Sequence, residues 1–231
     1  MKDSIKIIHD FLNSEKYKKF NYFVRDNLDV KTACLGINIY KNKIVSIKSY
    51  IAYRNYNDLK RFLKIPFIDK LYDNRDKDIS TISSPSISLK YYPEHNKFTH
   101  YFHLKFTKEF LMQHKKYFLP KHNKLNLVYL NKVGISIEDK KIIKYFYFSI
   151  SKDIIPLLTK KFNLSNKLPN KIEYVEYSDK FKFILDEDTE LKTLCLNKTT
   201  ALIIEYIEKK YNLKLKTGGR DSKNLISLYF F

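Results

Sequence analysis

The sequence predicts an α+β fold in which five helix-bracketed β-hairpins close a ten-stranded antiparallel barrel surrounded by helices. The main observation is a recurring unit of two stretches joined by a polar turn, and within each stretch apolar and polar residues alternate. The unit recurs about every 40 to 50 residues, which is the spacing of repeat architectures. Two of the four glycines, Gly36 and Gly134, occupy the same place in two copies. Each return stretch precedes a helical pattern or the chain end. We therefore expect a single repeat-built domain over residues 1–231.

The five hairpins follow one another along the chain. The first, over 34–53, turns at Lys41-Asn42, because alternation in Leu35-Gly36-Ile37-Asn38-Ile39 resumes at Lys43-Ile44-Val45. The third repeats this pattern as Val133-Gly134-Ile135-Ser136-Ile137 and Lys141-Ile142-Ile143, with a turn at 138–140. The others are predicted over 86–106, 171–185 and 213–231, with turns at 93–96, 178–179 and Gly218-Gly219-Arg220-Asp221.

About one helix is expected for each repeat. The first places Ile5, Ile8 and Leu12 on one face, and Asp3 or Ser4 caps its start. The last begins at Thr199 or Thr200 and places Ile203, Tyr206, Ile207 and Tyr211 at helical spacing. The intervening helices are predicted around 59–63 before Pro66, over 107–118 before Pro120, and from the Ser151 cap to 162.

The two faces of the predicted hairpins differ in chemistry. In the first hairpin one face is apolar and consists of Leu35, Ile37, Ile39, Val45, Ile47 and Ile51. The other is polar and consists of Gly36, Asn38, Tyr40, Ser46, Lys48 and Tyr50. If helices cover the apolar face, the polar face lines the inside of a barrel, and ten strands leave a cavity there. The alternative is an open meander whose polar face meets solvent.

Composition excludes several classes of protein. No apolar run approaches the 18 residues of a membrane span, and the N-terminus lacks the pattern of a secretory signal, so a cytoplasmic location is expected. Cys34 and Cys195 lack the spacing of a metal or redox pair, and His100 with His103 alone cannot complete a zinc shell. We therefore predict no metal site. The net charge of +19 favours an anionic partner.

The hairpin sequences Gly-Ile-Asn-Ile with Lys-Ile-Val-Ser-Ile-Lys-Ser-Tyr, and Gly-Ile-Ser-Ile with Lys-Ile-Ile-Lys-Tyr-Phe, resemble the ABBA-type aromatic prenyltransferases, the PT-barrel family. The resemblance covers nearly the whole chain and depends on repeat architecture and a Lys-x-Tyr strand pattern. It implies a soluble enzyme that moves an allylic isoprenyl group from its diphosphate to an aromatic acceptor inside the barrel. The family lacks an aspartate-rich metal motif, and Asp73, Asp76 and Asp78 do not form one here.

The resemblance also implies roles for residues on the polar face. The diphosphate-binding residues would be Lys48, Lys90, Lys105, Lys182 and Lys216. The aromatic shield would be Tyr50, Tyr92, Tyr101 and Tyr229. No cofactor is required on this hypothesis, and Mg²⁺ is an alternative that the sequence does not decide. Independently of family, two ammoniums about 8 Å apart repel by roughly 2 kcal/mol at a dielectric constant near 20, so a lysine-lined interior favours an anionic ligand.

Two other functions fit parts of the sequence. A basic nucleic-acid-binding protein of winged-helix or replication-initiator type accounts for the charge, but the last predicted helix mixes Glu205 and Glu208 with Lys209 and Lys210, and arginine is scarce. A barrel that only holds a lipid-like ligand is the third possibility. Salt-dependent DNA binding would identify the first rival, and ligand binding without turnover would identify the second.

Overall fold

A computed structural model of the protein describes residues 2–54, 86–107, 130–138, 141–148, 156, 160, 172–177, 180–185, 197–221 and 223–231. The α-helices described are α1 (Lys2–Asn13), α2 (Glu15–Asn27) and α8 (Lys198–Tyr211). The first six strands are β1 (Val30–Tyr40), β2 (Lys43–Tyr53), β3 (Ser86–Tyr92), β4 (Lys97–Thr107), β5 (Leu130–Glu138) and β6 (Lys141–Phe148). The last four are β7 (Ile172–Tyr177), β8 (Lys180–Leu185), β9 (Leu215–Asp221) and β10 (Ile226–Phe230).

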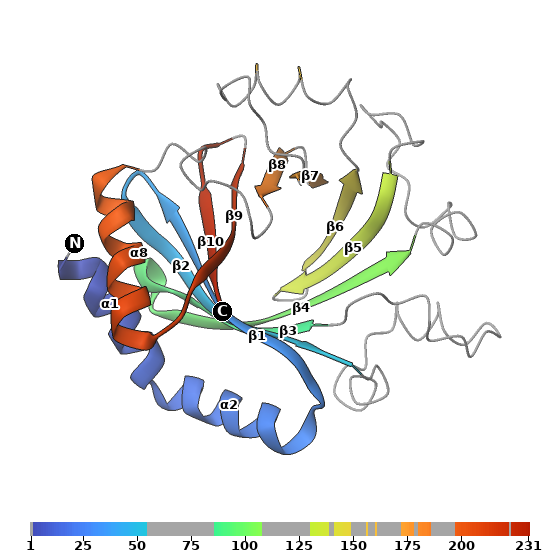
Figure 1. The fold of residues 1–231 in the computed structure, drawn as a ribbon. Helices are drawn as coiled ribbons and strands as arrows, with labels where there is room; N and C mark the ends of the chain where they lie inside the picture. The colour runs from blue at the N-terminus through green and yellow to red at the C-terminus, as the bar shows by residue number, and fades with distance from the viewer. Residues whose placement is uncertain are drawn as a thin grey trace.

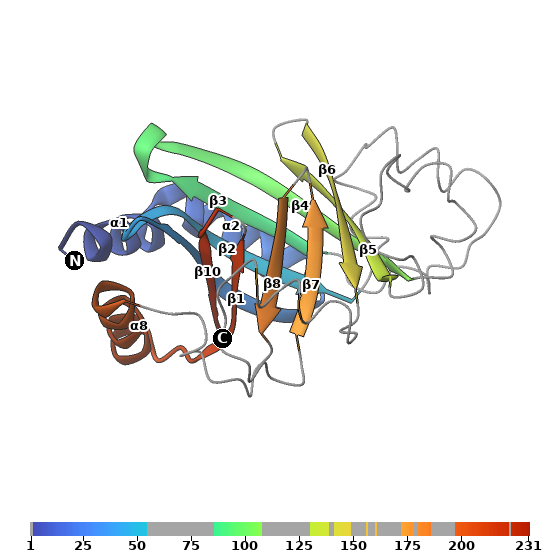
Figure 2. The same ribbon diagram turned by 90° about the horizontal axis from the view of Figure 1, so that it is seen from above.

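The sheet is antiparallel and curls into a barrel. Each strand pairs with the next along the chain, and β10 pairs with β1, so that the pairing returns to the first strand. The wall is uneven, because β6 pairs with β7 only over Phe146–Phe148, whereas β1 and β2 pair along almost their whole length. Figures 1 and 2 show the strands β1 to β5 curving round an interior, with the short strands β7 and β8 on the opposite side. An antiparallel, barrel-like sheet with helices agrees with the predicted class of fold.

The described helices lie outside the barrel beside β1, β2 and the neighbouring strands (Figure 1). Helix α1 buries Ile8 and Phe11, and α8 buries Ile203 and Ile207, as the spacing of apolar residues predicts. Helix α8 begins one residue after Asn197, whose side chain accepts a hydrogen bond from the Thr200 amide at 2.9 Å. The predicted first and last helices are therefore present.

Helix α2 was not predicted. It begins after Ser14, whose Oγ accepts a hydrogen bond from the Tyr17 amide at 3.2 Å, and it buries Phe20 and Val24, which are four residues apart. Its overall composition is strongly polar, which hides this narrow apolar stripe in the sequence. The first repeat consequently has two helices, where one for each repeat was expected.

The hydrophobic core lies between the outer face of the sheet and the helices. In the first hairpin Leu35, Ile37, Ile39, Ile47 and Ile51 are buried there, as predicted. Val45 is different, because the register shifts between Asn38 and Ile39, so that Ile39 pairs with Ile44. Ile44 therefore takes the buried position predicted for Val45, which is half-buried.

The first two hairpin turns are at the predicted positions. Lys41 and Asn42 both have positive φ, as a two-residue hairpin turn requires, and Asn96 is left-handed after the short 3₁₀ helix Pro93–His95. The predicted turn of the fifth hairpin is wrong, because Gly218 to Asp221 belong to β9. The chain reverses later, where Asp221 Oδ1 accepts hydrogen bonds from the amides of Lys223 and Leu225 at 2.8 Å each.

Several predicted elements cannot be compared with the structure. The helix expected around 59–63, the turn at 178–179 and Cys195 lie outside the described residues. The helix expected over 107–118 is described only at Thr107, the last residue of β4, and the turn expected at 138–140 only at Glu138, the last residue of β5. The helix expected from 151 to 162 is described only at Pro156 and Lys160, which are both helical. Among the helices that the structure describes, none is long and apolar enough to cross a membrane.

Candidate active-site cavity

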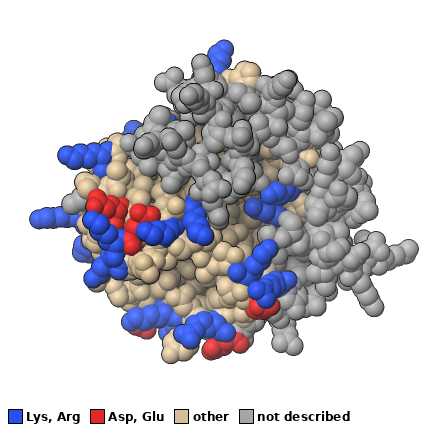
Figure 3. All heavy atoms as spheres, in the orientation of Figure 1, with Lys and Arg blue, Asp and Glu red and all other residues tan. Residues whose placement is uncertain are grey.

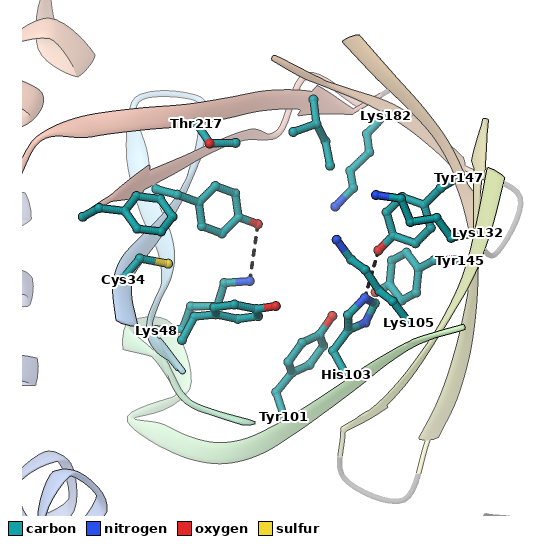
Figure 4. Close-up of a pocket in the computed structure, with 14 residues that line it drawn as sticks. Cys34, Lys48, Tyr101, His103, Lys105, Lys132, Tyr145, Tyr147, Lys182 and Thr217 are labelled. Carbon is teal, nitrogen blue, oxygen red and sulfur yellow. Dashed lines mark hydrogen bonds between the residues drawn. The ribbon is translucent and has the colours of Figure 1, made fainter. Parts of the chain in front are cut away.

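A cavity of about 450 Å³ occupies the interior of the barrel (Figure 4). This volume is within the range of about 300 to 1,000 Å³ that is usual for small-molecule sites. The lining residues are Cys34, Lys48, Tyr50, Tyr101, His103, Lys105, Lys132, Tyr145, Tyr147, Lys182, Ile184, Thr217, Tyr229 and Phe231. They come from strands round most of the sheet, so the inward polar face lines a chamber.

The chamber is electropositive. Four lysines line it, from β2, β4, β5 and β8, and the described lining contains no Asp or Glu. In Figure 4 the side chains of Lys105 and Lys182 extend into the same space from different walls. Burial lowers the pKa of Lys48, because a charged ammonium is poorly solvated there.

Tyrosine rings accompany the lysines. The Lys48 Nζ lies 5.7, 5.3 and 5.0 Å from the ring centroids of Tyr50, Tyr101 and Tyr229, and it donates a hydrogen bond of 3.4 Å to the Tyr229 hydroxyl. On the opposite wall the Nζ atoms of Lys105 and Lys132 lie 5.0 and 5.8 Å from the Tyr147 centroid, and Lys182 lies 5.6 Å from that of Tyr145. All of these distances are within the range of cation–π attraction.

The two glycines that the sequence places equivalently have equivalent surroundings. Gly36 pairs with Lys48 on β2 and with Tyr229 on β10. Gly134 pairs in the same way with Lys105 on β4 and with Tyr145 on β6. A Cβ at Gly36 would lie 2.8 Å from Lys48 Cε, and one at Gly134 would lie 2.6 Å from His103 Cε1. A Lys–Gly–Tyr arrangement across three strands therefore occurs twice, and each glycine leaves room for cavity side chains.

A hydrogen-bonded chain runs along the wall between β4, β5 and β6. The Tyr101 hydroxyl lies 2.7 Å from Ser136 Oγ, which lies 2.6 Å from His103 Nδ1. His103 Nε2 lies 2.9 Å from the Tyr147 hydroxyl, a contact drawn in Figure 4. Burial, followed by the charges of Lys105, Lys182 and Lys48, lowers the pKa of His103 well below its ordinary value.

A separate ion pair lies beside the chamber. Lys90 and Glu138 lie 3.2 Å apart, and each side chain is 15% exposed. The Glu138 carboxylate also accepts hydrogen bonds from Tyr92 and from Thr99 Oγ1, the latter at 3.0 Å. Lys90 and Tyr92, which the sequence places in the diphosphate site and the aromatic shield, are therefore engaged by a carboxylate and are not among the residues that line the cavity.

The structure brings six of the nine predicted site residues into the lining, namely Lys48, Tyr50, Tyr101, Lys105, Lys182 and Tyr229. Lys216 is placed differently, because it is exposed. The register shifts between Tyr229, which pairs with Thr217, and Phe230, which pairs with Leu215. Thr217 therefore lines the cavity, and Lys216 is displaced from the predicted position.

Sequence reasoning did not assign His103, Lys132, Tyr145, Tyr147, Cys34, Thr217, Ile184 and Phe231 to the site. The alternation that includes Gly134 and Ser136 does reach Lys132, so this lysine could have been found. Tyr145 and Tyr147 could not be assigned, because β6 has aromatic residues on both faces. Cys34 carries no useful signal, and burial raises the pKa of its thiol to about 12, which leaves it unreactive.

Comparisons with known proteins add little to this description. Neither a protein-family model nor a curated protein matches the chain. One solved structure, described as "6-dimethylallyl tryptophan synthase", is similar over 87% of this chain and 81% of that one, with a TM-score of 0.45 and 6% sequence identity. Similarity at this level does not establish a relationship, so the function has to be inferred from the cavity itself.

Proposed function

We propose that the chamber holds an allylic isoprenyl diphosphate and an electron-rich aromatic acceptor, and that the protein transfers the prenyl group from the first to the second. The observation that carries the proposal is the combination of four lysines and five tyrosines round one cavity. Lysines match a diphosphate, and tyrosine faces match an allyl cation. A site for a simple anion would not need the aromatic surface.

The lysines and the tyrosines have different roles in the proposed reaction. As the C–O bond of the donor ionises, negative charge grows on the departing diphosphate, so Lys105, Lys132 and Lys182 stabilise the transition state more than the bound donor. The allyl cation then lies against tyrosine rings such as Tyr101 and Tyr229, which attract it and exclude water. A carbon of the acceptor ring attacks the cation, and loss of the ring proton restores aromaticity.

Electrostatics supports an anionic ligand of high charge. Each pair of ammoniums about 8 Å apart contributes roughly 2 kcal/mol of repulsion at a dielectric constant near 20. A diphosphate bound near Lys105, Lys132 and Lys182, which all line the cavity, would reduce repulsion of this kind. Release of this repulsion favours binding of the whole donor, and the hydrocarbon tail can then occupy the aromatic part of the cavity.

The nucleic-acid-binding alternative has no specific observation in its favour. On α8 the Lys209 side chain pairs with Glu205 at 2.7 Å, which does not resemble a recognition helix. Figure 3 shows Lys and Arg spread over the described part of one face, with Asp and Glu among them. A positive stripe for a phosphate backbone is not formed there.

The proposal can be tested with Lys105→Gln and Lys182→Gln, which keep much of the side-chain length and remove the charge. Calorimetry with dimethylallyl diphosphate should show affinity falling by about tenfold or more for each variant, since a hydrogen bond to a charged group contributes roughly 1.5–3 kcal/mol. The control is Lys210→Gln, an exposed change on α8 that should leave affinity unchanged. Equal affinity in all three variants contradicts the diphosphate site.

Turnover is measured separately, by mass spectrometry after incubation with dimethylallyl or geranyl diphosphate and indole, tyrosine or 1,6-dihydroxynaphthalene. Prenylated product is expected, and its formation should be lost in the Lys105→Gln, Lys182→Gln double variant. Donor binding without product from any acceptor identifies the lipid-binding alternative. Steeply salt-dependent binding to duplex DNA, with no donor binding, identifies the nucleic-acid alternative.

The proposal requires no resident cofactor, because lysines take the place of metal ions at the diphosphate. Within the described residues, no group of three or more His, Cys, Asp or Glu residues is placed to hold a metal ion. Mg²⁺ can also bind the diphosphate itself. Turnover in EDTA compared with turnover in excess Mg²⁺ measures this contribution directly.

A further inference from the structure

We propose that Tyr101, Ser136, His103 and Tyr147 form a proton relay, which carries the proton lost by the aromatic acceptor to the departing diphosphate. The inference rests on the proposed function, because the relay needs a ring proton and a diphosphate in one chamber. Prenyl transfer creates this need, since the attacked ring carbon must lose its hydrogen. A lysine that binds the diphosphate as an ammonium has no lone pair with which to accept it.

The geometry of the four groups is that of an unbroken hydrogen-bonded chain. The three contacts are 2.7 Å from Tyr101 to Ser136, 2.6 Å from Ser136 to His103, and 2.9 Å from His103 to Tyr147. All three are normal hydrogen-bond lengths. Ser136 is 0% exposed and His103 is 5% exposed, so bulk water does not enter the middle of the chain. Both terminal groups, Tyr101 and Tyr147, line the cavity.

The two ends of the chain have different surroundings. At the Tyr147 end, the ammoniums of Lys105 and Lys132 both lie over the tyrosine ring. At the Tyr101 end, the Nζ atoms of Lys48 and Lys90 lie 5.3 and 5.9 Å from the ring centroid, and Lys90 is paired with Glu138 and does not line the cavity. Two lining lysines meet at the Tyr147 end and one at the Tyr101 end, so the diphosphate is placed at the Tyr147 end and the aromatic acceptor at the Tyr101 end.

The proton transfers balance along the chain. The C–H bond of the prenylated ring breaks, its electron pair restores the aromatic system, and the proton passes to the Tyr101 oxygen. The Tyr101 proton passes to Ser136 Oγ, and the Ser136 proton passes to His103 Nδ1. The Nε2 proton of His103 passes to the Tyr147 oxygen, whose own proton passes to the diphosphate. Each group gains one proton and loses one, so none changes its charge overall.

The relay needs a neutral imidazole, with a lone pair on Nδ1 and a proton on Nε2. An imidazolium would donate at both nitrogens and would block the transfer. Burial and the ammoniums of Lys48, Lys105 and Lys182 hold the pKa of His103 well below its usual range, so the ring is neutral at physiological pH. The described residues that line the chamber include no carboxylate that would oppose this effect.

The variant Tyr147→Phe tests the relay, because it keeps the ring beneath Lys105 and removes the hydroxyl. Ring-deuterated acceptor, chosen as the fastest substrate among indole, tyrosine and 1,6-dihydroxynaphthalene, should react as fast as ordinary acceptor in the wild type. In Tyr147→Phe the rate should fall by at least tenfold, and the deuterated acceptor should react more slowly than the ordinary one. Tyr91→Phe, which removes a hydroxyl outside the barrel, is the matched control and should behave as the wild type.

Ionisation of the donor is followed separately, by the exchange of bridging and non-bridging ¹⁸O in dimethylallyl diphosphate recovered from the reaction. This exchange should persist in Tyr147→Phe, because the lysines are intact. If Tyr147→Phe does not fold, Ser136→Ala interrupts the same chain and should give the same isotope effect. Exchange lost together with turnover would show that the hydroxyl serves donor binding, and would overturn the relay.

The tautomer of His103 provides a readout that does not depend on turnover. Nitrogen-15 NMR of the whole protein, with the signal assigned by comparison with His103→Gln, should show a neutral ring protonated at Nε2. A ring protonated at both nitrogens at pH 7, or at Nδ1 alone, overturns the relay as drawn.

The relay and the proposed function fail in distinguishable ways. Absence of wild-type product with every donor and acceptor overturns the proposed function, and the relay with it. Normal wild-type turnover, with unchanged rate and no isotope effect in Tyr147→Phe and Ser136→Ala, overturns the relay alone and leaves prenyl transfer standing.

Discussion

The substitution Gly134→Ala should destabilise the protein, because the site has no room for a methyl group. An added Cβ would lie 2.6 Å from His103 Cε1, 2.9 Å from Tyr147 Cε2 and 3.0 Å from His103 Nε2. Both rings belong to buried residues. Withdrawal of either ring would disturb the 2.9 Å hydrogen bond that joins them.

The expected magnitude follows from two opposing effects. Overpacking of a filled site costs about 1–3 kcal/mol. Replacing glycine by alanine returns about 0.4–1 kcal/mol by restricting the unfolded chain, and this gain applies because Gly134 does not have positive φ. The net loss is therefore about 1–2 kcal/mol, which corresponds to a fall in Tm of about 2–8 °C for a chain of this size.

The matched control is Gly36→Ala, at the equivalent place in the first repeat. The nearest atom there is the Lys48 Cε at 2.8 Å, near the end of a flexible side chain that can move at little cost. Its free energy of unfolding should lie within about 1 kcal/mol of the wild type. Urea unfolding followed by circular dichroism compares the three proteins. A Gly134→Ala variant as stable as Gly36→Ala would refute the close packing of His103 and Tyr147 on this strand.

Two further predictions concern the buried charges and hydroxyls. Glu138→Ala should lower the free energy of unfolding by about 3 kcal/mol, because it leaves the Lys90 ammonium without its carboxylate. Glu205→Ala, which removes an exposed pair on α8, should lower it by less than about 1 kcal/mol. Similar urea midpoints for the two variants would contradict a stabilising buried pair. Stability should fall as pH rises from 9 to 12, because burial raises the pKa values of Cys34 and Tyr50 to about 12, so the native state holds protons that the unfolded chain releases. This contribution is complete below pH 9, and a urea midpoint that stays constant or rises between pH 8 and 10.5 would show that burial does not raise these pKa values.

The sequence predicts which side chains share a face of a strand wherever the two faces differ in polarity. In β2, Ile47 and Ile51 lie under the helices while Lys48 and Tyr50 line the cavity, as alternation predicts. The same reasoning could not be applied to β6, where aromatic residues occupy both faces. Alternation alone therefore does not assign Tyr145 and Tyr147 to either face.

The register between paired strands is the second feature that could not be predicted from the sequence. The shift near Tyr229 moves Thr217 into the lining and leaves Lys216 exposed. A one-residue slip reverses the face of every side chain beyond it, and a bulge depends on how two strands fit against each other. Nothing in the sequence of β9 alone marks this position.

The chain alone was enough to establish the recurring hairpins, the first and last helices, and the inward lysine and tyrosine pattern of β2 and β4, because these depend on residue spacing within one segment. The three-dimensional pairing was needed to show that Lys90 is neutralised by Glu138 and that His103 joins Ser136 to Tyr147. These contacts link residues 30 to 50 positions apart, and they form only when register and strand order bring separate segments together. Gly36 and Gly134 illustrate both contributions. The sequence repeat places the two glycines at equivalent positions, whereas the Lys and Tyr residues beside each glycine are brought there by the pairing of neighbouring strands.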